Sequence, residues 1–366
     1  MIIRGGMVFT KEFQFERNNI RIENGLITEI TADEIEAQNS EEVIDAGEFM
    51  VIPGLTDLHF HGCVGYDFCD GTDEAITNMA RFQLSKGVTN ICPATMTLPK
   101  ERLEKICSKA AKHVSNLDEA DLCGINLEGP FISPGRCGAQ NPEYVHKPDQ
   151  DFLKELIDIS GGLTKLITIA PEEEGAIECI NALKDKIKFS VGHTLADYDQ
   201  ADKAFQAGAR QATHLFNAMP PFTHREPGVV GAALDHPDVM AELICDGIHI
   251  HPSMVRSIFK MFGDDRVILI SDSMRACGMP DGDYELGGLP VIKRGNRATL
   301  KDGTLAGSVT NLFDCMVNVI EMGVPIEQAV KAATYNPAKS IGILDKCGSI
   351  EKGKAGRLVL MDKDYH

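Results

Sequence analysis

The stretch V-I-P-G-L-T-D-L-H-F-H-G, residues 51–62, is an apolar run that ends in two histidines. Its first eight residues are apolar enough to form a buried strand, and His59 and His61 follow where that strand would stop. Residues two apart on an extended chain point to the same side, so both imidazoles could bind one metal ion. The H-x-H pattern alone fits equally well two polar residues that are hydrogen-bonded to loops.

Seven further short apolar runs follow, mostly separated by stretches with helical patterning such as 152–157 and 253–262. They lie at 87–92, 123–128, 164–169, 187–192, 210–215, 239–245 and 267–271. Eight strands that alternate with helices predict an α/β fold, with a closed (β/α)8 barrel of the TIM type. A doubly wound open sheet is the alternative. The barrel is favoured because most runs end in or beside His, Glu or Asp, and barrel enzymes assemble their sites at that end of the strands.

The two ends of the chain differ in pattern from the middle. Residues 1–52 alternate apolar and polar side chains in short runs, with hairpin turns predicted at Arg4-Gly5-Gly6 and Glu23-Asn24-Gly25. Residues 356–362, G-R-L-V-L-M-D, indicate one more strand. We therefore predict a small β-sandwich domain formed by residues 1–52 and 346–366, beside a metal-dependent barrel hydrolase domain over residues 53–345.

Composition and charge argue against several classes of partner. The chain has 366 residues, 43% of them apolar, and its 36 basic and 54 acidic side chains give a formal charge of -18. Such a charge repels nucleic acid and anionic membranes, although a few local cations can still bind a small anion in one pocket. The eleven cysteines form no C-x-x-C pair, and no leader pattern or long apolar span is present. We therefore expect a cytoplasmic protein with reduced thiols.

Three more predicted strand ends each carry one residue that can bind a metal ion. Glu128 closes the third run, His193 follows the fifth, and His214 closes the sixth. A carboxylate with two imidazoles suits zinc or ferrous iron and leaves a position open for water. Each residue by itself would be an ordinary core or loop residue. Together with His59 and His61, they predict a metal centre.

A carboxylate also follows the eighth run, in I-S-D-S at 270–273. Attack of water on an amide requires a group that removes the water proton and then protonates the departing amine, and one carboxylate can do both. We therefore predict that Asp272 is the general base and acid. The alternative is that Asp272 caps the next helix, which is common for Asp at a strand-to-helix junction.

The stretches around these residues carry a resemblance that runs nearly end to end. Its most specific pieces are H-L-F-N-A-M-P at 214–220, R-E-P-G at 225–228 and C-G-M-P-D-G at 277–282. In them the chain resembles the N-acetylglucosamine-6-phosphate deacetylases of the amidohydrolase superfamily. The resemblance implies hydrolysis of N-acetylglucosamine 6-phosphate to glucosamine 6-phosphate and acetate by metal-activated water, in amino-sugar catabolism. It also implies that Glu128, His193 and His214 bind the main metal ion and that Asp272 transfers the proton.

The resemblance further implies which residues contact the substrate. Arg225 and His249 would hold the sugar phosphate, since charge-assisted hydrogen bonds to phosphate oxygens are strong. Arg225 would reach into the site of a neighbouring subunit, so a homodimer is expected. The full implied set of substrate-binding residues is Ala139, Gln140, Asn217, Ala218, Arg225, His249, Leu305, Ala306 and Gly307.

Two places vary within this family and limit what can be carried over. Some members replace His59 and His61 and use a single metal ion; both histidines are present here. We therefore predict one or two divalent ions per subunit with Glu128 as the bridge, and we favour zinc over iron or cobalt. Gln140 stands where some members have a histidine that polarises the acetyl carbonyl. Its amide can still donate a hydrogen bond, or a second metal ion could polarise the carbonyl instead.

Alternative functions remain open at this stage. One is a deacetylase that prefers N-acetylgalactosamine 6-phosphate, and another is an acyl-amino-acid hydrolase without a phosphate clamp, against which Arg225 and His249 argue. From a different class, the chain could be a catalytically inactive scaffold with the amidohydrolase fold. The complete set of predicted metal ligands, together with Asp272, argues against this last alternative.

Overall fold

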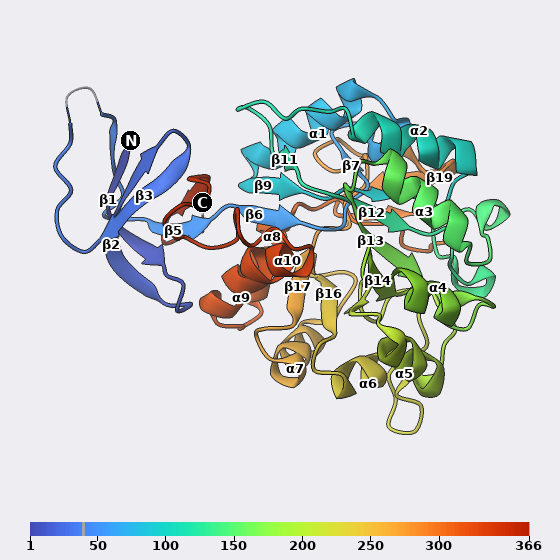
Figure 1. Ribbon diagram of the computed structural model, residues 1–366. Helices are drawn as coiled ribbons and strands as arrows, with labels where there is room; N and C mark the ends of the chain where they lie inside the picture. The colour runs from blue at the N-terminus through green and yellow to red at the C-terminus, as the bar shows by residue number, and fades with distance from the viewer. Residues whose placement is uncertain (39–40, 366) are drawn as a thin grey trace.

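The computed structural model describes residues 1–38 and 41–365, and the eight apolar runs form the eight strands of a barrel (Figure 1). These strands are β6 (Leu55–Asp57), β9 (Val88–Ile91), β12 (Ile125–Glu128), β13 (Thr164–Ile169), β14 (Lys188–Val191), β15 (Gln211–Ala212), β16 (Met240–Ile244) and β17 (Val267–Ile270). Nearly all their residues are buried, because helices cover the outside and side chains fill the inside.

Hydrogen bonds close these strands into a ring. One parallel sheet has the order β10-β12-β13-β14-β15-β16-β17, where β10 is Ala94–Thr95, and another has the order β11-β9-β6, where β11 is Asp121–Leu122. Backbone bonds join the two sheets: Asp272 N donates to His59 O at 2.8 Å, and Asn126 N donates to Pro93 O at 3.0 Å. The predicted TIM-like barrel is confirmed, and the open-sheet alternative is wrong.

Ten helices among the described residues pack around the barrel (Figure 1). The two stretches with predicted helical patterning lie in α3 (Gln150–Ile159) and α7 (Pro252–Phe262). In α7 the buried residues recur at the three- and four-residue spacing of one helix face. The others are α1 (Asp73–Ser85), α2 (Lys100–Ala110), α4 (Ala176–Leu183), α5 (Tyr198–Ala207), α6 (Gly228–Asp235), α8 (Leu312–Glu321), α9 (Ile326–Ala333) and α10 (Tyr335–Ser340).

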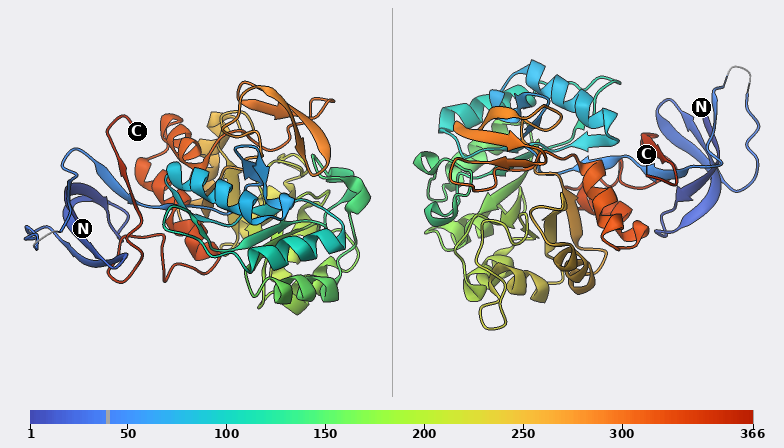
Figure 2. Two further views of the ribbon diagram at one scale, coloured as in Figure 1. Left: turned by 90° about the horizontal axis from the view of Figure 1, so that it is seen from above. Right: turned by 180° about the vertical axis from the view of Figure 1, so that it is seen from behind.

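A six-stranded sheet beside the barrel contains strands from both ends of the chain, as predicted. Its strands are β1 (Ile2–Phe9), β2 (Phe15–Glu23), β3 (Leu26–Thr31), β4 (Val43–Asp45), β5 (Met50–Pro53) and β21 (Leu358–Met361). The order is β21-β5-β1-β2-β3, with β4 paired to β1. Both views in Figure 2 show this sheet to one side of the barrel, with N and C marked close to it. Because β5 leads almost directly into β6, the sheet holds the start of the first barrel strand.

The two predicted hairpin turns have different outcomes. Asn24 and Gly25 form the turn between β2 and β3, with φ of 52° and 78°, as predicted. The turn predicted at Arg4-Gly5-Gly6 is wrong, because these residues lie inside β1. The register of β1 on β2 shifts between Ile3 and Gly6, and Gly5 has a φ of 70°. The glycines therefore allow a bulge within the strand instead of a turn.

Small elements that the sequence analysis did not predict surround one end of the barrel. An antiparallel sheet of β18 (Gly282–Leu286), β19 (Leu289–Arg294) and β20 (Arg297–Thr299) follows the eighth strand, and β7 (Gly62–Cys63) pairs with β8 (Tyr66–Asp67). Three short 3-10 helices occur at Phe68–Asp70, Pro134–Arg136 and Pro142–Tyr144. None of the helices in the described part of the chain has the length and apolar character needed to span a membrane.

Candidate metal centre and active site

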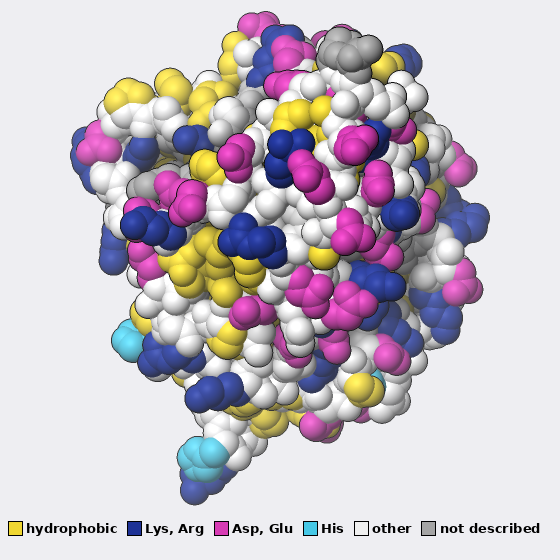
Figure 3. Space-filling model, turned by 90° about the vertical axis from the view of Figure 1, so that its left-hand side faces the viewer, with side chains coloured by type: hydrophobic (Ala, Val, Ile, Leu, Met, Phe, Trp, Pro, Cys, Tyr) yellow, Lys and Arg dark blue, Asp and Glu magenta, His cyan; other side chains and the backbone are white. Residues whose placement is uncertain are grey.

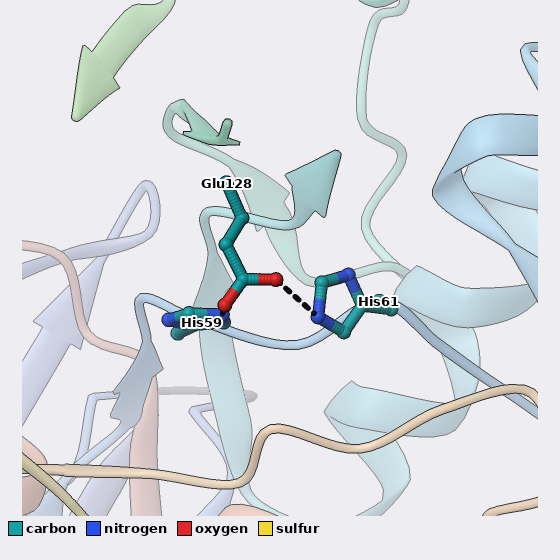
Figure 4. A group of neighbouring side chains, drawn as sticks. All are labelled: His59, His61 and Glu128. Atoms are coloured by element: carbon teal, nitrogen blue, oxygen red, sulfur yellow. Dashed lines mark ion pairs between the residues drawn. The ribbon is translucent and has the colours of Figure 1, made fainter. Parts of the chain in front are cut away.

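Four histidines converge on the carboxylate of Glu128 at the carboxyl end of the barrel. Glu128 Oε1 lies 3.1 Å from His59 Nε2, 3.1 Å from His193 Nε2 and 3.0 Å from His214 Nε2, and Glu128 Oε2 lies 3.2 Å from His61 Nε2. Figure 4 shows the imidazoles of His59 and His61 next to the two oxygens of this carboxylate. All five side chains are buried, so the cluster is shielded from bulk water.

The cluster contains two groups of metal-ligand type that share Glu128. His59, His61 and Glu128 form one group, and Glu128, His193 and His214 form the other. Within each group the candidate ligand atoms lie within 4.8 Å of one another. The structure therefore brings together all five residues that the sequence analysis selected as ligands, in an arrangement where Glu128 can bridge two ions.

The hydrogen bonds of these imidazoles show that the donor set fits a cation. His193 Nδ1 lies 3.0 Å from the carbonyl oxygen of Arg136, which can only accept, so Nδ1 carries the proton and a neutral His193 has a lone pair at Nε2. His193 Nε2 lies 3.0 Å from His214 Nε2, and His59 Nε2, 3.1 Å from Glu128 Oε1, makes no well-aligned hydrogen bond among the described residues. Lone pairs that face one another and a carboxylate repel, and a divalent cation removes this repulsion.

The electrostatics of the cluster favour ionised carboxylates. Burial opposes the charge of Glu128, but the neighbouring His59 and His193 hold the pKa of Glu128 well below its usual value. Burial also opposes a charge on His61, yet hydrogen bonds with Asp272 and Glu128 raise the pKa of His61 to about 10. Without a bound metal ion, protonated histidines would thus balance these negative oxygens, and a divalent ion could supply that positive charge instead.

Asp272 lies beside the same imidazoles. Its Oδ1 is 3.3 Å from His61 Nε2 and 3.8 Å from His59 Nε2, and only 7% of the residue is exposed. Burial opposes its charge, but the hydrogen bond with His61 and attraction to His59 lower the pKa of Asp272. The described chain continues from Asp272 into turns and then β18, and no helix starts directly after this residue, so its alternative role as a helix cap is wrong.

A cavity of about 480 Å³ opens above the metal-ligand cluster. His61, Glu128, His193, His214 and Asp272 lie at its wall. Seven of the nine residues predicted to bind substrate also line it, namely Ala139, Gln140, Asn217, Ala218, His249, Leu305 and Gly307. The volume suits a small molecule such as a sugar phosphate.

The remaining two predicted substrate residues lie elsewhere in this chain. Arg225 is exposed in the loop between β15 and α6 and lines a separate surface hollow with Tyr198 and Glu226. Ala306 is fully buried, and its N–H donates to Ala298 O at 3.0 Å instead of facing the cavity. One chain alone therefore does not bring Arg225 to the cavity.

Gln140 is held by the groups around it. Its Oε1 accepts from Thr97 N at 2.6 Å, and its Nε2 donates to Glu128 Oε2. The backbone bond fixes which end of the amide faces the metal-ligand cluster. One N–H of Gln140 is thus used by Glu128, and the amide nitrogen has a second hydrogen for another acceptor.

Several residues of the site were missed by the sequence analysis. Asp246 Oδ2 lies 2.8 Å from His249 Nδ1, and its Oδ1 accepts from the backbone N–H groups of Ile248 and His249. The D-x-x-H spacing of Asp246 and His249 was a signal that could have suggested this contact. Arg136 also lines the cavity, and Glu242 contacts His59. Glu242 gave little signal, because it lies inside an apolar strand run.

Comparisons with known proteins give one consistent result. A model of the amidohydrolase family matches residues 50–366. The N-acetylglucosamine-6-phosphate deacetylase of Bacillus subtilis (strain 168) is 37% identical over 370 residues, which cover 100% of this chain and 93% of that protein. The N-acetylgalactosamine-6-phosphate deacetylase of Escherichia coli O157:H7 is 32% identical, with coverage of 100% and 96%.

A solved structure is also similar over the whole chain. It is an aspartate-to-alanine mutant of N-acetyl-D-glucosamine-6-phosphate deacetylase from Mycobacterium smegmatis in complex with N-acetyl-D-glucosamine-6-phosphate. Its TM-score to this chain is 0.92 at 33% sequence identity, and the match covers 100% of this chain and 95% of the other. The similarity therefore includes the six-stranded sheet as well as the barrel.

Proposed function

This chain belongs to the amidohydrolase family, and from that membership we propose that it is a metal-dependent deacetylase of N-acetylglucosamine 6-phosphate. The products would be glucosamine 6-phosphate and acetate, as part of amino-sugar catabolism. The observation that carries this proposal is the convergence of five metal-ligand side chains, four of which line one cavity together with Asp272. A scaffold without activity would have no need to keep this set of residues together.

We assign Glu128, His193 and His214 to one metal ion, and His59, His61 and Glu128 to a second. Bound ions would act as Lewis acids toward water and the acetyl carbonyl. Zinc is our proposed metal, since it binds imidazole and carboxylate ligands and commonly keeps one coordination position open for water. Iron and cobalt are the alternatives. The β13 strand supplies no bridging lysine, because its Lys165 is the second of six residues, at the opposite end from the cavity.

Asp272 is the proposed proton-transfer residue. As a carboxylate with a lowered pKa, it can accept a proton from the attacking water at Oδ1. It then delivers that proton to the nitrogen of the departing amine. Its backbone is fixed on both sides, because Asp272 N donates to His59 O and Ser308 N donates to Asp272 O at 2.7 Å. The backbone that carries this carboxylate is therefore fixed beside the metal-ligand cluster.

The cavity residues provide the proposed substrate contacts. His249, oriented by Asp246, donates to the sugar phosphate, and the backbone of Asn217 and Ala218 supplies further contacts. Gln140 can donate its free amide hydrogen to the acetyl oxygen. Leu305 and Gly307 contribute backbone groups at the cavity wall, whereas Ala306 acts only by continuing this loop.

We also propose a homodimer in which Arg225 completes the partner's site. The loop between β15 and α6 reaches the lowest part of the chain in Figure 1, where it projects away from the barrel. Figure 3 shows a projection in the same low position with His and Lys or Arg side chains at its tip. Its residues Pro221–Glu226 are exposed, and Arg225 does not line the cavity of its own chain. A cation on such a loop suits a phosphate in a neighbouring subunit.

The proposed function is tested by measuring amine release from three substrates. They are N-acetylglucosamine 6-phosphate, its unphosphorylated form, and N-acetylgalactosamine 6-phosphate, each with protein loaded with zinc or with ferrous iron. We expect rapid turnover of the phosphorylated gluco-sugar alone. Preference for the galacto-sugar would support the alternative suggested by one relative. Inactivity on all three, with metal bound, would contradict the proposal.

A further inference from the structure

Glu242 is a buried carboxylate beneath the metal-ligand cluster. It is the third residue of β16, between apolar neighbours, and its exposed fraction is 0%. Its Oε2 lies 3.0 Å from His59 Nδ1 and also accepts from His214 N at 3.2 Å. Its Oε1 accepts from Gln211 Nε2 at 2.5 Å. Glu242 therefore contacts one histidine of each metal position, His59 through the ring and His214 through the backbone.

The charge of Glu242 has no permanent cation beside it. Among the described residues its one ion-pair partner is His59, with no Lys or Arg nitrogen within 4 Å. When His59 gives up its extra proton to bind a metal ion, Glu242 meets only neutral donors, and a buried carboxylate in that state keeps a large desolvation cost. A cation bound to the other nitrogen of His59 would offset that cost. The His59 ring would lie between Glu242 and such a cation, with Nδ1 bound to Glu242 and Nε2 facing the cation.

The contact with Glu242 also sets the orientation of His59. A carboxylate only accepts, so His59 carries a proton on Nδ1 and directs Nε2 to Glu128 Oε1, 3.1 Å away. The carboxylate is itself fixed, because Ser340 Oγ donates to Gln211 Oε1 at 2.6 Å and leaves Gln211 Nε2 for Glu242. A chain of hydrogen bonds thus runs from α10 to His59.

The two metal positions differ in this respect. At the position of His193 and His214, the Nδ1 of His193 faces a neutral carbonyl, and the Nδ1 of His214 is buried without a hydrogen-bond partner. Only the position of His59 and His61 has a histidine that donates to a charged acceptor outside the ligand set. A charged acceptor makes an imidazole a stronger ligand and adds attraction for a cation.

We propose that Glu242 is the positioning residue that makes the metal position at His59 and His61 bind its ion tightly. It holds His59 in the orientation that presents Nε2, and it supplies a negative charge that a second divalent ion neutralises. This inference rests on the two-ion centre of the proposed function. It adds a residue in β16, outside the cavity lining, that sets how tightly the second ion is held.

The test uses the full chain with Glu242→Gln, which keeps the side-chain size and an oxygen for His59 but removes the charge. Zinc dissociation constants and the number of bound ions are measured in metal buffers, with elemental analysis after dialysis. We expect wild type to bind two ions. We expect the variant to keep one ion with unchanged affinity and to bind the second about 10–100-fold more weakly.

Glu119→Gln is the matched control. Glu119 is also fully buried and also pairs with a histidine, since its Oε2 lies 3.2 Å from His113 Nε2, but it contacts no residue of the metal centre. It should still bind two ions with wild-type affinity. In a His59→Ala background, Glu242→Gln should change metal affinity no further, because its effect acts through His59.

The outcomes separate this inference from the proposed function. Wild type that binds one ion at most would contradict the two-ion centre, and this inference with it. Two ions bound equally tightly by wild type and Glu242→Gln would overturn this inference alone. If Glu242→Gln does not fold, Glu242→Asp replaces it, since the shorter side chain keeps the charge but loses contact with Nδ1. Unchanged affinity for the second ion in Glu242→Asp would also overturn the inference.

Discussion

Three residues of the site, His193, His214 and Asp272, have left-handed backbone, with φ of 47°, 27° and 47°. A residue other than glycine costs on the order of 1–3 kcal/mol in such a conformation, so neighbouring structure must hold it there. Long-range bonds do so. Ser133 N donates to His193 O, His214 N donates to Glu242 Oε2, and Asp272 N donates to His59 O. Long-range hydrogen bonds therefore hold the strained backbone of these three site residues in place.

For these three residues, the sequence predicted their role but not their backbone conformation. Their chemical types and their places after apolar runs were enough to select them. Their backbone conformation was not predictable, because neither histidine nor aspartate requires left-handed backbone and the bonds that hold it come from distant segments. For the same reason Glu242 could not be selected from the sequence, because its role depends on His59, a neighbour that only the folded chain supplies.

Lys188 is expected to make stability depend on pH. It begins β14, where burial and the nearby cations of Arg210 and Lys339 lower the pKa of Lys188 from 10.5 to about 8. Between these two values the unfolded chain binds the proton more tightly than the folded one, so wild type gains stability as pH rises through this window. Below pH 8 the folded protein bears the full free-energy cost of burying the protonated Lys188. Lys188→Met should therefore stabilise the protein at pH 7 by on the order of 2 kcal/mol.

Urea unfolding of wild type and Lys188→Met at pH 7, 9 and 10.5 measures this effect. The extra stability of Lys188→Met over wild type should decrease from pH 7 to pH 9 and be nearly absent at pH 10.5. Lys186→Met, at an exposed position two residues earlier, is the control and should change stability by less than about 0.5 kcal/mol at each pH. A gain for Lys188→Met that does not vary with pH would show that the lysine charge is not its cause.

Among the elements, the loop after β20 is expected to set the position of Asp272. Gly307 has a φ of 63°, and a Cβ added there would lie 2.8 Å from Asp272 O. That oxygen accepts from Ser308 N, so Gly307→Ala would push the loop away from Asp272. We expect a kcat at least about tenfold lower, as for a displaced catalytic group. Steady-state kinetics at saturating substrate measures it.

Gly303→Ala is the control that separates the clash with Asp272 from the conformational strain of an alanine at positive φ. Gly303 lies in the same loop with a φ of 90°, but a Cβ there would meet nothing within 4 Å. Both variants should lose about 1 kcal/mol of stability from the backbone, and only Gly307→Ala should lose the larger part of kcat. Equal kcat values in the two variants would contradict a link between Gly307 and Asp272.

The elements differ in how well the sequence predicted them. All eight barrel strands and both proposed helices are found, because long apolar runs and helical spacing are strong local signals. The sheet of β18, β19 and β20 was missed, since β18 reads G-D-Y-E-L and buries only Leu286. The turn at Arg4-Gly5-Gly6 was wrong because two glycines suit a bulge as well as a turn.

At the scale of the whole molecule, the proposed homodimer predicts complementation between two inactive variants. Arg225→Ala removes the phosphate cation, and Asp272→Asn should lower kcat by about 10²–10⁴-fold with metal retained. If Arg225 serves the partner's site, a mixed dimer has one site with both Asp272 and Arg225. Variants that are mixed, unfolded and refolded together should then recover about a quarter of wild-type activity, given random pairing into dimers.

Each variant refolded alone is the control and should stay inactive. Activity that does not rise on mixing, with dimers shown by sedimentation, would mean that Arg225 does not act across the interface. The fold and the metal-ligand cluster could be anticipated from one chain's sequence. The proposed place of Arg225 came from the family resemblance alone, because packing between two chains leaves no local pattern in either sequence.

The pairing of β21 with β5 also has a consequence for how the protein is made. Leu358 pairs with Pro53, so about 300 residues must leave the ribosome before β5 gains this neighbour. At synthesis rates of about 5–20 residues per second, that wait lasts roughly 15–60 s. During translation one edge of β5 stays open to other nascent chains. A message that stalls before codon 358 would yield a protein whose barrel is fully encoded but whose first sheet still exposes that edge.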